Sequence, residues 1–167
     1  MTEFGDNITL SAISWDLALL VFVATVLFVL GLSGGRRAII PFLVALYIAR
    51  TVAELSENFP QIQLPVFAEA AVFLGTAAVI TWLLSGSALT EFLRFSTKGL
   101  SVWWQILVAA VLGAGLFGTL FFPLIPKDAA VFSVLIDRFI LRNPFPFLWA
   151  FAPVAFLFFL RAESDNN

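Results

Sequence analysis

The chain of 167 residues contains no cysteine and no histidine. Without cysteine there is no disulfide, zinc thiolate or redox thiol. Without histidine the chain lacks a common metal ligand and the commonest general base. The serines and threonines therefore have no histidine to activate them, and neither a phosphate-binding GxxxxGK[ST] motif nor an HExxH motif is present. These absences predict a protein that is not an enzyme and has no catalytic, cofactor-binding or metal site.

Charge is also scarce, because only 12% of the residues are charged whereas 61% are hydrophobic. A soluble domain is usually about one quarter charged. Nine basic and eleven acidic residues leave a net charge of −2, which gives no general attraction to nucleic acid. The composition excludes a soluble globular enzyme, a disordered chain and a nucleic-acid-binding module. It predicts that the partner of most of the surface is the lipid bilayer.

Apolar runs of about the length of a membrane span follow one another along the chain. Twenty helical residues rise about 30 Å, which matches the hydrocarbon core of a bilayer. These runs lack the alternating pattern of barrel strands, so helices are expected. We expect residues 1–167 to form a single all-α membrane domain, a bundle of four to five transmembrane helices. The expected spans are 13–32, 38–55, 64–84, 102–125 and, less regular because of its prolines, 143–160.

Two connecting segments have the pattern of amphipathic helices that lie in the headgroup plane. Residues 87–100 and 127–142 each combine apolar positions with a charged side. The alternative is that they are polar connectors docked on the bundle. A re-entrant or surface-lying segment at 143–160 is likewise an alternative to a fifth span.

Basic residues in short loops indicate the orientation of a membrane protein. The first loop, 33–37, contains Arg36 and Arg37 and no acidic residue, whereas the second loop has no basic residue. This pattern predicts an outside N-terminus and, with five spans, an inside C-terminus. The loop 126–142, with three basic residues, argues against this orientation if the fifth span crosses. Arg36 and Arg37 could alternatively contact lipid headgroups or a partner.

Three charged residues fall within or near the ends of the expected spans, where each costs free energy unless it is paired or hydrated. Asp16, Arg50 and Glu69 are expected near the same leaflet and could form an intramembrane polar cluster, structural or ion-carrying. Asp16 could instead cap its helix, Glu69 could be hydrated at the interface, and Arg50 could pair with Glu54 four residues on.

Small residues predict where helices approach one another closely, since lipid provides no hydrophobic drive for association. They either pack helices within one chain or form a subunit interface. The expected helix-packing residues are Gly31, Gly35, Gly75, Ala110, Ala114 and Gly118. Gly75 belongs to a stripe on the third span that is formed by Ala68, Ala71, Gly75 and Ala78.

Residues 13–125 resemble the colicin V production protein family. Asp16 opens the first span, and a turn with Gly31, Gly35, Arg36 and Arg37 leads into AIIPFLVALYIA. A third span, an amphipathic connector and a fourth span rich in small residues follow. The resemblance implies a small protein of the bacterial inner membrane with a role in envelope maintenance or toxin secretion, and no enzymatic activity.

Three functions therefore remain open. The first is a non-enzymatic scaffold or export helper of the cell envelope. The second is an accessory subunit of a larger membrane complex, whose partners are other membrane proteins or further copies of this chain. The third is a small ion channel or carrier that uses Asp16, Arg50 and Glu69.

Overall fold

The computed structural model describes residues 14–34, 36–57, 67–85, 102–126 and 132–164. Every regular element within these ranges is helical. The elements are α1 (Trp15–Gly34), α2 (Arg36–Glu57), α3 (Ala68–Ser85), α5 (Val102–Phe121), η1 (Phe122–Leu124), α6 (Val134–Ile136), η2 (Asp137–Leu141) and α7 (Phe145–Ser164).

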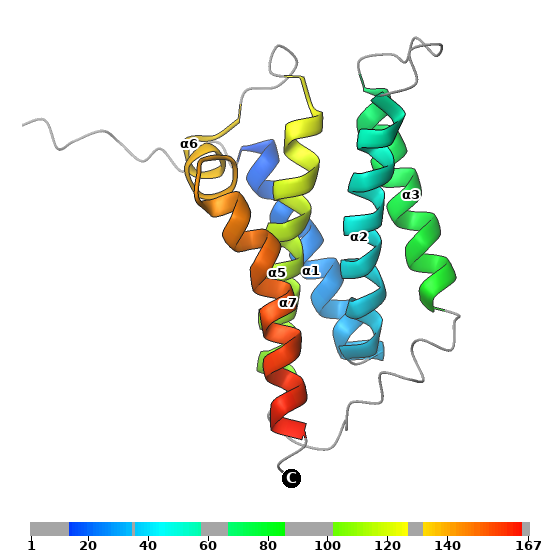
Figure 1. Cartoon of the computed structure of the whole chain (residues 1–167). Coiled ribbons are helices and arrows are strands. Elements are labelled where there is room, and N and C mark those ends of the chain that lie inside the picture. Colours follow the sequence, from blue (N-terminus) through cyan, green and yellow to red (C-terminus); the bar gives the residue numbers. More distant parts are fainter. Residues whose placement is uncertain (1–13, 35, 58–66, 86–101, 127–131, 165–167) are drawn as a thin grey trace, which may run out of the picture.

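Four of the described helices are long and apolar enough to cross a membrane, and they correspond to the first four expected spans. The predicted all-α membrane bundle is confirmed. Val134–Leu141 and Phe145–Phe156 pass the same test only together, with a bend of 60° between them. The expected fifth span, 143–160, corresponds to α7, whereas the short helical segment before the bend belongs to the expected amphipathic segment 127–142. Helix α7 runs beside α5 to the other end of the bundle (Figure 1).

The long helices run up and down in alternation (Figure 1). The beginning of α1, the end of α2, the beginning of α3 and the end of α5 lie at one end of the bundle, which we call the Asp16 end. The helical segment α6–η2 lies at one side of this end, next to the start of α1, and is seen along its axis in Figure 1. The opposite end contains the α1–α2 junction and the end of α7.

Helix α5 is the most buried span, and it packs against α1, α2 and α7. Its small residues allow this, because helix backbones approach closely where no side chain intervenes. At Gly115 the ring of Trp149 from α7 occupies the space that a Cβ would need. At Gly31 of α1 a Cβ would lie 2.5 Å from Cγ2 of Ile106. Both glycines are therefore required for close helix contacts.

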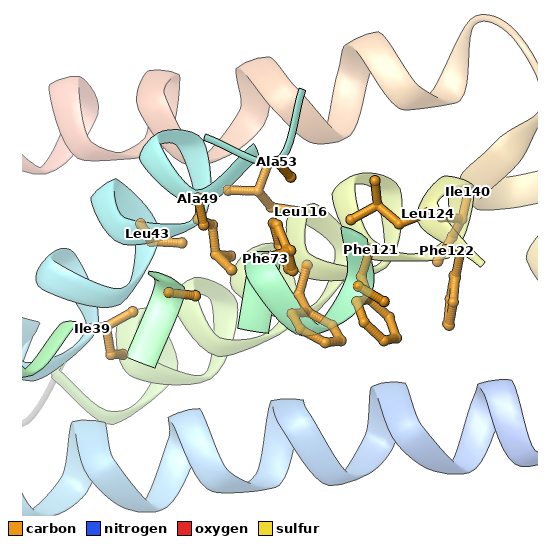
Figure 2. Close-up of a cluster of buried hydrophobic side chains, with 14 of the residues drawn as sticks. Ile39, Leu43, Ala49, Ala53, Phe73, Leu116, Phe121, Phe122, Leu124 and Ile140 are labelled. Atoms are coloured by element: carbon orange, nitrogen blue, oxygen red, sulfur yellow. The ribbon is translucent and has the colours of Figure 1, made fainter. Parts of the chain in front are cut away.

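A core of apolar side chains joins α2, α3 and α5 (Figure 2). Leu43 and Ala49 of α2 face Phe73 of α3 and Leu116 of α5 in this cluster. Phe73 also begins a chain of aromatic contacts that continues along α5 into η1 and reaches α1 and the start of α6. The rings in this chain are Phe73, Phe117, Phe121, Phe122, Phe132 and Trp15. Aromatic packing thus connects four parts of the bundle at the Asp16 end.

A side-chain donor joins α7 to η2 at a carbonyl group that the helical backbone leaves without a partner. In η2 the N–H of Arg142 bonds to the carbonyl of Asp137, five residues earlier, at 2.9 Å. The same register would match the Phe139 carbonyl to Pro144, which has no N–H. Trp149 Nε1 donates to this carbonyl instead, at 2.8 Å. The Trp149 indole therefore supplies the hydrogen bond that is missing at the bend, and its ring packs on α5.

A second side-chain hydrogen bond joins α2 to α7. The Tyr47 hydroxyl donates to the carbonyl of Ala150. In the helical register this carbonyl faces the N–H of Val154, whereas Pro153 leaves the neighbouring carbonyl of Trp149 without a donor. Tyr47 thus adds a bond between helices one residue from the carbonyl that Pro153 deprives of its donor.

We predict that Gly115→Ala destabilises the bundle, because the new methyl group displaces the Trp149 ring and with it the bond to Phe139. Overpacking of this kind costs about 1–3 kcal/mol. Gly75→Ala is the matched control, since no atom lies within 4 Å of a Cβ at that position. Thermal unfolding in detergent, followed by circular dichroism, should show a lower midpoint for Gly115→Ala only. Equal midpoints for the two variants would contradict the packing described for α7.

Candidate functional site

The carboxyl group of Asp16 is the most completely buried charged group in the described part of the chain, with no exposed surface. Its Oδ2 accepts the backbone N–H of Ser133 at 2.6 Å, and its Oδ1 accepts the N–H of Leu17 at 2.8 Å. The side chain of Ser14 adds a hydrogen bond. Both carboxyl oxygens are therefore occupied within the protein.

The bond to Ser133 joins two segments that are 117 residues apart. Ser133 is the N-cap of α6, and its hydroxyl accepts the N–H of Ile136 at 3.3 Å. Asp16 lies in the first turn of α1, where the helix dipole favours a negative charge. A single carboxyl group thus stabilises the start of α1 and holds the start of α6 against it. We call this arrangement the Asp16 latch.

In the described ranges no ion pair or hydrogen bond joins Asp16, Arg50 and Glu69, although the segments that carry these residues lie at the same end of the bundle (Figure 1). Arg50 Nε contacts Glu54 Oε1 at 2.8 Å on its own helix. A pair four residues apart needs less ordering than one between helices, and Asp16 is already occupied by backbone donors. Glu69 is half-buried in the first turn of α3, with no ion pair to Arg50 among the described residues.

The structure separates the predicted helix-packing residues into two groups. Gly31, Ala110, Ala114 and Gly118 are buried between helices of this chain. Gly75 packs against no other described helix, because it lies with Ala71 and Ala78 on the exposed side of α3. The buried side is formed by Ala70, Phe73 and Ala77, one or two positions away along the helix.

Several predictions concern residues outside the described ranges. Gly35 and the amphipathic segment 87–100 are among these, as are the side chains of Arg36 and Arg37. The second amphipathic segment, 127–142, is described from residue 132. There Ile136 and Ile140 are buried against the bundle whereas Asp137 and Arg138 are exposed, as an amphipathic helix requires.

Polar groups inside the described spans are bonded mainly to the backbone. The hydroxyls of Thr25, Thr81 and Thr119 each donate to the carbonyl four residues earlier in the same helix. In the part of the chain that the structure describes, no three acidic residues are grouped as metal ligands would be. The arrangement at the Asp16 end is suited to holding helices together.

Sequence reasoning missed the residues that complete this arrangement, namely Ser133, Tyr47 and Trp149. Ser133 had a readable signal, because serine before an apolar run is a common helix N-cap. The single tyrosine of the chain lies in an apolar span, and a buried tyrosine hydroxyl usually finds a hydrogen-bond partner. No pattern in the sequence indicated which carbonyl groups these side chains would reach.

Scans against protein-family models, curated protein sequences and solved structures found no match for this chain. The class of protein therefore follows from the fold alone. Four apolar helices of sufficient length define a small integral membrane protein. The resemblance to the colicin V production family stays a prediction.

We predict that Asp16→Ala releases α6 from α1, because the Ser133 N–H loses its acceptor; an unsatisfied buried donor costs about 1–3 kcal/mol. Asp16→Asn keeps one carbonyl oxygen and should have a smaller effect. Because the chain has no cysteine, Ile140→Cys provides a single thiol on the side of η2 that is buried against the bundle. This thiol should react faster with a thiol reagent when Ile140→Cys is combined with Asp16→Ala than when Ile140→Cys is present alone. Glu69→Gln, at the same end, is the control that should leave the rate unchanged; an unchanged rate with Asp16→Ala would contradict the latch.

Proposed function

We propose that this small integral membrane protein is a non-enzymatic scaffold or export helper of the cell envelope. The observation that carries the proposal is the use of its intramembrane polar groups. Asp16, Tyr47 and Trp149 each connect two helical elements through a backbone group. Polar groups used in this way make a bundle rigid, which is what a scaffold requires.

An accessory subunit of a larger membrane complex is the second candidate, and the outer side of α3 favours it. Ala71, Gly75 and Ala78 are exposed there, together with Trp82. Small residues on a lipid-facing side would allow a helix of another membrane protein, or of a second copy, to approach closely. The opposite side of the same helix already packs against α2 and α5.

The proposed location is the bacterial inner membrane, with the N-terminus outside. Location and the role in envelope maintenance or toxin secretion rest on the resemblance to the colicin V production family. The orientation rests on Arg36 and Arg37. Opposite sides for the beginning of α1 and the end of α7 are supported by the bundle, since α1 begins at the Asp16 end and α7 ends at the opposite end (Figure 1).

To test the subunit role, Gly75→Leu is compared with Ala18→Leu, which places the same side chain on an exposed position of α1. If α3 contacts a partner, Gly75→Leu should remove a stoichiometric partner from the complex purified in mild detergent, because the added side chain separates the helices. Ala18→Leu should retain it. A partner retained by both variants would exclude the α3 side as the interface, and a chain that purifies alone would favour the scaffold facing lipid.

The ion-carrier alternative makes an opposite prediction. Asp16 is bonded to Ser133 and Arg50 is paired with Glu54, which leaves Glu69 as the residue of the three that could accept an ion. We expect proteoliposomes to show no proton or cation flux above that of empty liposomes. The Glu69→Gln variant should be indistinguishable from the parent protein. Flux that is present in the parent and abolished by Glu69→Gln would overturn the scaffold proposal.

A further inference from the structure

The segment α6–η2 has a fixed position at one side of the Asp16 end of the bundle (Figure 1). The Asp16 latch holds its N-cap, Ser133, and the indole of Trp149 donates to the carbonyl of Phe139 in η2. Ile136 and Ile140 face the bundle and are 3% and 4% exposed. The remaining sides of the segment are therefore presented outward in a defined orientation.

The depth of the segment follows from α1. This helix has 20 residues, which rise about 30 Å, so that its first turn lies at the edge of the hydrocarbon core when it spans the bilayer. Trp15, in that turn, packs against Phe132 just before α6, and tryptophan is enriched at this boundary. Because Asp16 fixes α6 beside this turn, the segment lies at the level of the lipid headgroups.

The outward sides carry apolar and basic groups together. Leu135 and Phe139, four residues apart, are 54% and 47% exposed. Arg138 and Arg142, also four apart, are exposed, and in the described ranges neither forms an ion pair. The Arg138 guanidinium lies 5.9 Å from the centre of the Phe139 ring. Asp137 is the one acidic residue of the segment, so these described charges sum to +1.

We propose that α6–η2 binds the headgroup of an anionic phospholipid, with the guanidinium groups of Arg138 and Arg142 on the phosphate. Arginine donates paired hydrogen bonds that match phosphate oxygens. The exposed Leu135 and Phe139 contact the first part of the acyl chains, as the apolar side of an interfacial helix does. Free phosphate would leave these two side chains in water, which is why the lipid is the ligand. The inference depends on membrane integration and not on the scaffold role.

For the test, the detergent-purified protein is reconstituted in nanodiscs of phosphatidylcholine and phosphatidylglycerol. The measurement identifies the lipids that stay bound to the protein. We expect phosphatidylglycerol to be enriched over the input mixture in native mass spectra of the parent protein. Arg138→Gln combined with Arg142→Gln should reduce this preference roughly tenfold to thirtyfold, since one basic residue near an anionic surface contributes about fivefold. Asp137→Asn, on the same segment, is the control that should retain the preference.

Two further arms identify the ligand and the role of the latch. Inorganic phosphate, compared with sodium chloride at the same ionic strength, should not displace the retained lipid. Asp16→Ala should weaken the preference while helical content stays unchanged, because it frees the segment without removing a basic residue. The proposal is overturned by lack of enrichment in the parent, by enrichment that survives the double arginine substitution, or by displacement with phosphate alone.

Discussion

Close approach to α5 is the constraint on which the rest of the bundle depends. In a bilayer, apolar side chains gain little free energy when they move from lipid into a helix interface. Helices therefore associate through van der Waals packing and hydrogen bonds. Helix α5 meets this requirement with small residues such as Gly115, against which the Trp149 ring lies, and with Ala110 and Ala114 at other contacts. Helices α1, α2 and α7 use it as a common packing surface. Gly75, which has no neighbour at its Cβ position in the described part of the chain, belongs to a helix at the edge of the bundle (Figure 1).

Two of the hydrogen bonds between elements form where the helical backbone has an unused group. Asp16 accepts the N–H of Ser133, the residue before α6, and Trp149 donates to the carbonyl of Phe139, whose partner in the register of η2 would be Pro144. Tyr47 adds a third bond, to the carbonyl of Ala150 in α7. An unpaired backbone group costs several kcal/mol in hydrocarbon, so helix ends and prolines determine where polar side chains are useful. The same positions join distant parts of the chain, which explains why few polar residues are sufficient to fix α6 and α7.

The sequence predicts the helices well and their polar contacts poorly, for a physical reason. Span length and apolar content are local properties, and they locate α1, α2, α3 and α5 closely. The amphipathic pattern also identifies the described part of 127–142, with Ile136 buried and Arg138 exposed. The partner of Asp16 lies 117 residues away, and no local pattern encodes that distance. For Arg50 the sequence allowed either a cluster with Asp16 and Glu69 or a pair with Glu54, and the structure has the pair with Glu54, which orders fewer groups because both residues lie on one helix.

The two ends of the bundle therefore differ in what they can do. At the Asp16 end, aromatic rings connect α3, α5 and α1. The latch holds α6–η2 at one side of this end (Figure 1), and the basic side chains of this segment are exposed. Such a segment cannot sink into the hydrocarbon, because Arg138 and Arg142 would lose their hydration. It cannot leave the membrane surface either, since Ile136, Ile140 and the buried carboxyl of Asp16 hold it to the spans. The fixed depth of this segment gives the bundle a defined position relative to one leaflet, and this position is what a scaffold or an accessory subunit would provide to its neighbours.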